Sequence, residues 1–280
     1  MTSTTLPFKV SSLLFCLLFS IIRCRTHSLN MAINMVVYMF VWSTGFDQLC
    51  RVDPRFQIYR KALFSQSTKT LDRDKLGLEE NRKLDNLIGN FCKLLSSYFL
   101  LPAAFKVLEY LIRKFQANER NVVELMCAAL PYHGTNEFVR LVQTLELDRG
   151  GIFAFLSPMK ETGVAIPRML LVQRCLTDRG LFRFILDMGQ EMGNARISGR
   201  VVMPFYGALL CEVLAASPSL DQSLLEMVFP YLIQALSRDV IAEFRAVIYM
   251  VIVQLASRVN LSHESLNGEK SMCSTPLGFL

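Results

Sequence analysis

The sequence predicts an all-α fold in which antiparallel helix pairs stack side by side into an α-solenoid. Along most of the chain, apolar residues recur at steps of three and four, which is the spacing of one helix face. Many segments carry a second apolar set beside the first, so each helix is expected to contact neighbours on more than one side. Residues 164–166 resemble a strand fragment, but a sheet needs several strands and no others are predicted.

Composition agrees with a chain whose surface is extensively covered. Of the 280 residues, 52% are hydrophobic and only 19% are charged, whereas soluble domains have roughly 25% charged residues. Either a membrane part is present or much of the surface contacts other protein. The net charge of +6 is compatible with an acidic or RNA-rich environment and by itself indicates neither. The eight cysteines include no C-x-x-C pair and the three histidines lie far apart, which favours free, buried thiols in a reducing compartment over a zinc site.

The first 44 residues differ from the rest and are left unassigned. Residues 10–22 form an apolar run flanked by Lys9 and by two arginines, as in a secretory signal. At about 1.5 Å per residue, a helix of this run is too short for the roughly 30 Å hydrocarbon core, and no cleavage site of small residues follows it. Three interpretations stay open: a signal or anchor, a buried amphipathic start of the fold, and a divergent or wrongly assembled N-terminus. We favour the last two.

The array begins with two helical segments separated by a polar one. Over residues 45–63, apolar positions follow helical steps that are interrupted at Asp53-Pro54. There the aspartate can cap a new helix and the proline can occupy its first turn. Residues 65–82 are polar and charged, which predicts a loop with a frayed helix, and the helical pattern resumes over 84–95.

The segment after Ser97 gives the strongest helix signal in the chain. Its principal apolar face consists of Tyr98, Leu101, Phe105, Leu108, Ile112 and Phe115, and a second apolar set of Leu100, Ala104, Val107 and Leu111 lies beside it. The narrow polar stripe that remains consists of Lys106, Glu109, Arg113 and Gln116. Arg113, Lys114 and Arg120 are candidates for contacts to phosphate, although such side chains usually form a solvated helix face.

Helices are predicted to continue with short interruptions to residue 258. They span 120–130, 135–147, 167–176, 179–192, 198–216, 221–237 and 239–258, and turns containing Gly, Pro and Ser separate them. Asp148-Arg149-Gly150 and Asp178-Arg179-Gly180 introduce similar apolar residues thirty positions apart, which fits either a repeated helix-entry turn or coincidence. The predicted array therefore covers residues 45–258, and a polar, disordered tail covers 259–280.

A compact motif lies between two of these helices. Leu130-Pro131-Tyr132-His133 is followed by Thr135, Phe138 and Arg140. His133 can make a polar contact to a partner or to RNA, or it can cap a helix or bond to its neighbours within the turn. We favour the second interpretation, because a histidine in a turn usually has such a local role.

Near the C-terminus, a helix that contains a proline is followed by a turn and a second apolar helix. Pro230 lies inside the first helix, where a proline removes a backbone hydrogen bond and bends the helix. Asp239 follows in the turn, and Arg245 comes six residues later. This arrangement resembles a HEAT repeat, although the step from Pro230 to Asp239 is about one residue long for that pattern. The resemblance implies that Asp239 and Arg245 join neighbouring repeats by charge-assisted hydrogen bonds; the alternative is a surface ion pair that adds little stability.

The sequence contains none of the common catalytic or cofactor motifs. It has no G-x-G-x-x-G, no P-loop lysine motif, no G-x-S-x-G elbow and no H-E-x-x-H. Asp72-Arg73-Asp74 is too short for a calcium loop, and a catalytic triad would have to use one of the three scattered histidines. We therefore predict no catalytic residue, no cofactor and no metal, and a protein that is not an enzyme.

Several blocks together resemble one known family. Besides Leu130–His133 with its downstream Phe-Val-Arg, they are Leu63-Phe64-Ser65, Tyr98-Phe99-Leu100-Leu101, Leu108–Arg113, and Phe229-Pro230-Tyr231 with Arg245-Ala246. In this order, over about residues 45–258, they resemble the N-terminal part of HEAT repeat-containing protein 1, the U-three small nucleolar RNA-associated protein 10 family. The resemblance implies HEAT-like antiparallel helix pairs. Residues 1–44 and the tail depart from the family pattern and family members are very long, so we expect a fragment, a short isoform or an incomplete gene model.

The resemblance also implies a function, that of a nucleolar, non-enzymatic scaffold of the small-subunit processome. The family supports ribosomal DNA transcription and processing of the small-subunit ribosomal RNA precursor. The implied partners are other processome proteins and, directly or through them, pre-ribosomal RNA and small nucleolar ribonucleoprotein; no small-molecule substrate and no membrane is implied. Two alternatives stay open: a membrane-anchored or secreted helical protein that uses the apolar N-terminal run, and a transport adaptor of the importin type with the same fold.

Overall fold

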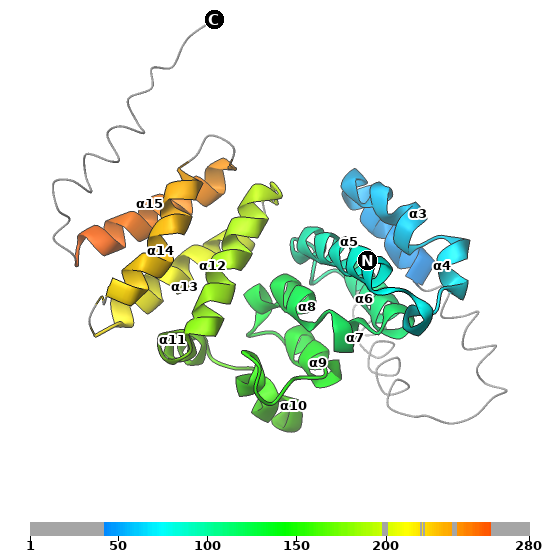
Figure 1. Cartoon of the computed structure of the whole chain (residues 1–280), viewed down its shortest axis with the longest axis horizontal. Helices are drawn as coiled ribbons and strands as arrows, with labels where there is room; N and C mark the ends of the chain where they lie inside the picture. The colour runs from blue at the N-terminus through cyan, green and yellow to red at the C-terminus, as the bar shows by residue number, and fades with distance from the viewer. Residues whose placement is uncertain (1–41, 198–200, 219, 221, 237–239, 259–280) are drawn as a thin grey trace, which may run out of the picture. The chain divides into compact units, whose positions relative to one another are not determined.

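The protein is helical throughout the part that the structure describes. The computed structural model describes residues 42–197, 201–218, 220, 222–236 and 240–258 (Figure 1). Every regular element in these ranges is an α-helix or a 3-10 helix, and helices such as α11 and α12 or α14 and α15 pack on one another, so the predicted all-α fold is confirmed. Within the same ranges, no helix combines the length and the apolar character needed to cross a membrane. The apolar run over 10–22 and the tail over 259–280 lie outside the described residues, and the predicted domain boundaries stay predictions.

The chain divides into two compact units. The N-terminal unit comprises Met1–Phe91 and Tyr98–Asn121, and the C-terminal unit comprises Cys92–Ser97 and Val122–Leu280. Helix α5 (Leu78–Ser96) therefore contributes its first turns to one unit and its last turn to the other.

The N-terminal unit contains the Asp53-Pro54 break as the sequence predicts. Its elements are a helix over residues 42–52, η1 (Pro54–Tyr59), α3 (Arg60–Leu63), α4 (Gln66–Thr70), η2 (Arg73–Lys75), the first turns of α5, α6 (Pro102–Phe115) and α7 (Ala117–Arg120). The backbone amide of Arg55 donates to Oδ1 of Asp53 at 2.9 Å, and Pro54 occupies the first turn of η1. The hydroxyl of Tyr98 donates to Oδ2 of the same aspartate at 3.0 Å, which fixes the cap from a distant part of the chain.

Two boundaries in this unit differ from the prediction. Residues 65–82 hold α4, η2 and the start of α5 instead of a loop with a frayed helix. Ser65 and Asp72 begin the two short helices by accepting hydrogen bonds from backbone amides, at 3.4 and 3.2 Å, so side-chain caps replace the apolar periodicity that the segment lacks. Helix α6 begins at Pro102, which fits its first turn as the sequence predicts, although Tyr98 and Leu101, which were counted on its apolar face, precede it.

The core of the N-terminal unit is aromatic. Trp42 and Tyr110 have ring centroids 4.4 Å apart, and Phe46 stacks on Phe64 at 4.1 Å. Phe64 also contacts Phe91 of α5 at 5.4 Å. Because all five side chains are buried, these contacts join the first helix of the unit to α5 and α6.

The C-terminal unit stacks helices in pairs. Its elements are α8 (Val122–Ala129), η3 (Leu130–Tyr132), α9 (Asn136–Thr144), η4 (Ala154–Leu156), α10 (Ser157–Thr162), α11 (Arg168–Thr177), α12 (Arg179–Asn194), α13 (Val202–Ala216), α14 (Gln222–Ala235) and α15 (Ala242–Ala256). Helix α12 packs on α11 and α14, and α13 packs on α11 and α15 (Figure 1). The short helices η4 and α10 were not predicted. Pro158 lies in the first turn of α10, where a proline favours the start of a helix.

Two glycines allow these helices to approach one another closely. A Cβ atom on Gly189 of α12 would lie 2.1 Å from Cε2 of Tyr206 on α13, so only a hydrogen fits there. A Cβ atom on Gly207 of α13 would lie 2.9 Å from Cγ1 of Val247 on α15. Glycine at both positions is therefore a packing requirement of the stacked helices.

Candidate functional site

The Leu130-Pro131-Tyr132-His133 motif forms a buried turn that fastens α8 to the last turn of α5. The hydroxyl of Tyr132 donates to the carbonyl of Ser96 at 2.6 Å, and Oγ of Ser96 donates to the carbonyl of Ala128 at 3.0 Å. Both bonds satisfy carbonyls near helix ends, which have no partner within their own helix. Burial raises the pKa of Tyr132 to about 12, so its hydroxyl stays protonated as a donor. Leu130 and Pro131 are buried beside it.

The residues that follow the motif begin helix α9. Oγ1 of Thr135 accepts from the backbone amide of Phe138 at 3.2 Å and donates to the carbonyl of Tyr132 at 2.8 Å. Thr135 is therefore the N-cap of α9, and Phe138 is fully buried in the first turn. Arg140 lies half-buried on the next turn. The motif as a whole builds the helix junction and presents little surface.

His133 is half-buried against α13. Its ring centroid lies 5.6 Å from that of Phe205, and the guanidinium of Arg168 lies 5.6 Å from the same Phe205 ring. Nε of Arg168 also donates to Oε2 of Glu212 at 2.7 Å. Burial, and then the positive charge of Arg168, lower the pKa of His133 below its usual value, and the Glu212 carboxylate opposes this only in part. The neutral imidazole is thus the form that fits the folded protein.

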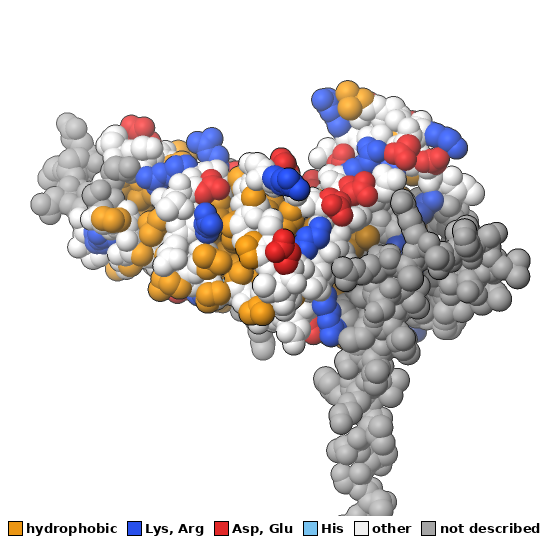
Figure 2. Space-filling view, turned by 90° about the horizontal axis from the view of Figure 1, so that it is seen from below, with side chains coloured by type: hydrophobic (Ala, Val, Ile, Leu, Met, Phe, Trp, Pro, Cys, Tyr) orange, Lys and Arg blue, Asp and Glu red, His pale blue; other side chains and the backbone are white. Residues whose placement is uncertain are grey.

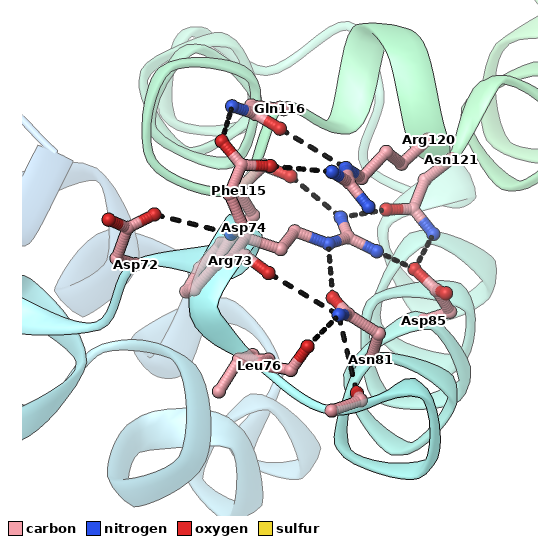
Figure 3. Close-up of polar contacts among 11 residues, drawn as sticks. Asp72, Arg73, Asp74, Leu76, Asn81, Asp85, Phe115, Gln116, Arg120 and Asn121 are labelled. Carbon is pink, nitrogen blue, oxygen red and sulfur yellow. Dashed lines mark hydrogen bonds and ion pairs between the residues drawn. The ribbon is translucent and has the colours of Figure 1, made fainter.

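A polar network centred on Arg73 organises the N-terminal unit (Figure 3). Its guanidinium is buried, with 2% of the side chain exposed. Nη1 donates to the carbonyl of Phe115 at 2.6 Å and to Oδ1 of Asn121 at 2.8 Å, and Nη2 is ion-paired with Asp85. Nε donates to Oδ1 of Asn81 at 3.2 Å. One side chain thereby connects η2, α5, the C-terminal end of α6 and the end of α7.

The partners of Arg73 are also bonded to one another. Nδ2 of Asn121 donates to Oδ1 of Asp85 at 3.0 Å, and Nδ2 of Asn81 donates to the carbonyl of Leu76 at 3.1 Å. Asn121 is completely buried. A buried charge is tolerated only when it is paired and hydrogen-bonded in this way, so the network holds the segments in one arrangement.

The three basic residues considered for phosphate contacts all make contacts within the N-terminal unit. Arg120 pairs with Asp74 at 2.6 Å, at the exposed edge of the Arg73 network. Nζ of Lys114 donates to the carbonyl of Leu71 at 2.7 Å, and burial lowers its pKa. Arg113 pairs with Oε1 of Glu109 at 2.8 Å. The charge of each of the three side chains therefore has an intramolecular contact.

Glu109 contradicts its predicted place on the polar stripe of α6. It is only 3% exposed, and burial raises its pKa although Arg113 opposes the shift. The four-residue spacing from Glu109 to Arg113 was a signal for this ion pair. The sequence placed both on a solvated stripe because it does not show that a neighbouring element covers this side of α6.

In the HEAT-like block of the C-terminal unit, Pro230 is an exposed residue inside α14, and Arg245 lies half-buried on α15. Asp239 lies outside the described residues, so its pairing with Arg245 stays a prediction. Other contacts join the segment from α14 to Arg258 to the preceding helices. The hydroxyl of Tyr231 donates to Oδ1 of Asp187 on α12 at 2.5 Å. Nη2 of Arg258 donates to the carbonyl of Ser217 at 2.8 Å, at the end of α13, where a cation complements the helix dipole.

The potential metal ligands of the described ranges are scattered. Within the described ranges, no three His, Cys, Asp or Glu side chains gather at a site that could hold a metal ion. The described cysteines are free, and burial raises their pKa, in Cys127 and Cys175 to about 12. Thiols of this kind are protonated at neutral pH and are poor nucleophiles. The geometry is therefore that of a folded helical framework with internal polar ties.

The amino-acid sequence is similar to those of several known proteins. No family model matches the chain. HEAT repeat-containing protein 1 of Homo sapiens is 32% identical over 232 residues, which is 80% of this chain and 11% of the human protein. The Drosophila melanogaster homolog of HEAT repeat-containing protein 1 is 31% identical over 80% of this chain. The chain is homologous to HEAT repeat-containing protein 1.

The chain is also similar to proteins that are named for their association with U3 small nucleolar RNA. U3 small nucleolar RNA-associated protein 10 of Aspergillus niger is 28% identical over 236 residues, 80% of this chain and 13% of its own length. The chain thus spans about a tenth of the length of these relatives. Homology to proteins named for HEAT repeats, together with the stacked helix pairs, makes the fold class an α-solenoid of HEAT-like pairs, as predicted. The names of these relatives denote no enzymatic activity.

Proposed function

We propose that this protein is a non-enzymatic scaffold of the nucleolar small-subunit processome, which supports ribosomal DNA transcription and processing of the small-subunit ribosomal RNA precursor. The homology to HEAT repeat-containing protein 1 and to U3 small nucleolar RNA-associated protein 10 carries the proposal. The helical framework supports it, because helix pairs that fill their interiors with side chains leave only outer surfaces on which function can reside.

The mechanism is display. Internal ties such as the Arg73 network hold each unit in one shape, and the helices present fixed surfaces on which other processome proteins assemble. Pre-ribosomal RNA and small nucleolar ribonucleoprotein are reached directly or through those proteins. The intramolecular contacts of Arg113, Lys114 and Arg120 favour protein partners over phosphate for this part of α6 and α7. The scaffold uses no cofactor and no small-molecule substrate, and it works away from membranes, in the nucleus.

Localisation and RNA processing in the source organism test this function. A fluorescently tagged full chain is expected in the nucleolus, and depletion of the endogenous protein is expected to raise the ratio of unprocessed precursor to mature small-subunit RNA on a blot. A tagged chain found in the cytosol or in secretory membranes, together with unchanged precursor levels, would refute the proposal.

Structure-based variants make the same test specific to the fold. A depleted cell supplied with Lys75→Met is expected to recover processing, since this side chain is 82% exposed. Arg73→Met, two residues away, removes the buried guanidinium and is expected to fail. Equal rescue by both variants would show that the buried network around Arg73 is not needed for the function.

A further inference from the structure

One corner of the N-terminal unit combines exposed aliphatic side chains with positive charge. The chain turns at Asp53-Pro54, between the helix over residues 42–52 and the segment of η1 and α3. Val52 and Ile58, on either side of this turn, are 55% and 72% exposed. In the upper right part of Figure 2, at the edge of the N-terminal unit, hydrophobic and basic side chains lie next to each other.

The acidic residues near this corner are already engaged. Residues 51–61 include four basic residues and one acidic residue, Asp53. Asp53 is only 6% exposed and is paired with Arg55 at 2.7 Å. Arg60 is paired with Asp47 of the preceding helix at 2.7 Å. These carboxylates therefore neutralise two of the four basic residues and leave the charge of the other two.

The other two basic side chains complete the corner. Arg51 and Lys61 are exposed, and no ion pair in the described part of the chain involves either of them. A 3-10 helix has three residues per turn, so Arg55 and Ile58 lie in line on η1, and Lys61 follows three residues later on α3. The corner surface, defined by Arg51, Val52, Arg55, Ile58 and Lys61, thus presents aliphatic side chains between cations.

We propose that the corner surface docks an acidic segment of a partner protein, which carries aliphatic side chains among its Asp and Glu residues. The carboxylates of this segment complement Arg51 and Lys61, and its aliphatic side chains cover Val52 and Ile58. The inference gives a place and a chemistry to the protein partners of the proposed scaffold, but the charge and exposure that support it do not depend on that function.

Two other occupants fit the corner surface less well. Proteins that bind single-stranded RNA commonly stack its bases on aromatic side chains. The aromatic residues of this segment, Phe56 and Tyr59, are 0% and 6% exposed and lie in the core instead. A second copy of the chain, related by a two-fold axis, would bring two basic surfaces together. An acidic protein segment avoids both difficulties.

Photo-crosslinking from the corner surface tests this inference. The tagged full chain is expressed in the source organism with benzoylphenylalanine in place of Ile58. In the control, the same group replaces Val164 of the C-terminal unit, which is similarly exposed at 66%. After irradiation, crosslinked protein segments are identified by mass spectrometry, and attached RNA is detected by end-labelling. We expect position 58, but not position 164, to crosslink to a protein segment in which Asp and Glu outnumber Lys and Arg.

Charge reversal gives a second readout of the same contact. Arg51→Glu combined with Lys61→Glu is expected to lower the yield of this crosslink about tenfold, because two attractions become repulsions. Arg149→Glu combined with Arg174→Glu changes the net charge by the same amount on exposed side chains of the C-terminal unit, and is expected to leave the yield unchanged. The fluorescence of the buried Trp42 checks that the N-terminal unit stays folded. If the double variant fails this check, Lys61→Glu alone replaces it, with an expected loss of about threefold.

Every other result overturns the inference. These results are a yield at position 58 no higher than at position 164, a crosslink to RNA or to a second copy of the chain, a crosslinked segment without an excess of acidic residues, and a yield that charge reversal leaves unchanged. The identity of the crosslinked protein does not enter this decision. An acidic segment from a protein outside ribosome biogenesis would support the docking surface and count against the proposed function.

Discussion

Replacing Arg73 by methionine tests the physical account of the N-terminal unit. Methionine fills a similar volume but removes the guanidinium that pairs with Asp85 and donates to the carbonyl of Phe115 and to Oδ1 of Asn121. Removing one partner of a buried ion pair destabilises a protein by about 3–5 kcal/mol. The Asp85 side chain is 34% exposed, so water replaces part of what is lost, and we expect about 3 kcal/mol, the lower end of that range.

Urea unfolding followed by tryptophan fluorescence measures this loss in the correct unit. Trp42 is the single tryptophan of the chain, and it is buried in the N-terminal core against Tyr110. For a slope of about 2 kcal/mol per molar urea, a loss of 3 kcal/mol lowers the midpoint by about 1.5 M. Arg73→Lys keeps the charge but loses the planar fork of donors, so its midpoint is expected to lie between those of the methionine variant and the unaltered chain.

The matched control is Lys75→Met in the same short helix. Lys75 is 82% exposed and pairs with Asp72 at 3.1 Å on the protein surface, so the change is expected to stay within about 0.5 kcal/mol. If Arg73→Met unfolds within the same margin, the network does not stabilise the unit and the reasoning from burial and pairing is wrong.

Three further predictions concern the C-terminal unit. Gly189→Ala places a methyl group against the Tyr206 ring and is expected to lower stability by about 1–3 kcal/mol. Thermal unfolding followed by circular dichroism measures this loss. In the control, Gly134→Ala, the added atom meets nothing within 4 Å, so stability is expected to change little. Tyr132→Phe removes the bond to a buried carbonyl and is expected to cost about 1–2 kcal/mol in urea unfolding; an unchanged midpoint would show that the bond adds no stability. Because burial lowers the pKa of His133 in the folded protein, the unfolded chain binds a proton first as pH falls below about 6.5, so stability drops on going from pH 7.5 to 5.5. His133→Gln is expected to reduce that drop, and an identical pH dependence in the variant would contradict the assignment.

The sequence predicts the helices well because the signals that start and continue a helix lie within a few residues of one another. Periodic apolar residues, the Asp53-Pro54 cap and the Thr135 N-cap all act within a few positions of the residues that they organise. Helix α10, which was not predicted, also has a local signal. Pro158 lies in its first turn, and proline is common at helix starts as well as in the loops between helices.

No comparable short-range pattern in the sequence predicts the Arg73 network. Arg73 lies eight residues from Asn81 but 42 from Phe115 and 48 from Asn121, so its partners meet only when the helices pack. The burial of Glu109 depends in the same way on which element covers α6. The role of Gly189 follows from the position of Tyr206 on the next helix. These features belong to tertiary packing, which periodicity within one segment does not determine.

Affinity purification tests the central claim, that the stacked helices serve as a scaffold in ribosome biogenesis. The tagged full chain is purified from nuclear extract, and its proteins and RNAs are quantified against a purification of Arg73→Met expressed at the same level. The account predicts that processome proteins and U3 small nucleolar RNA are enriched with the unaltered chain and depleted with the variant. Purification of the unaltered chain without either class of partner would contradict it.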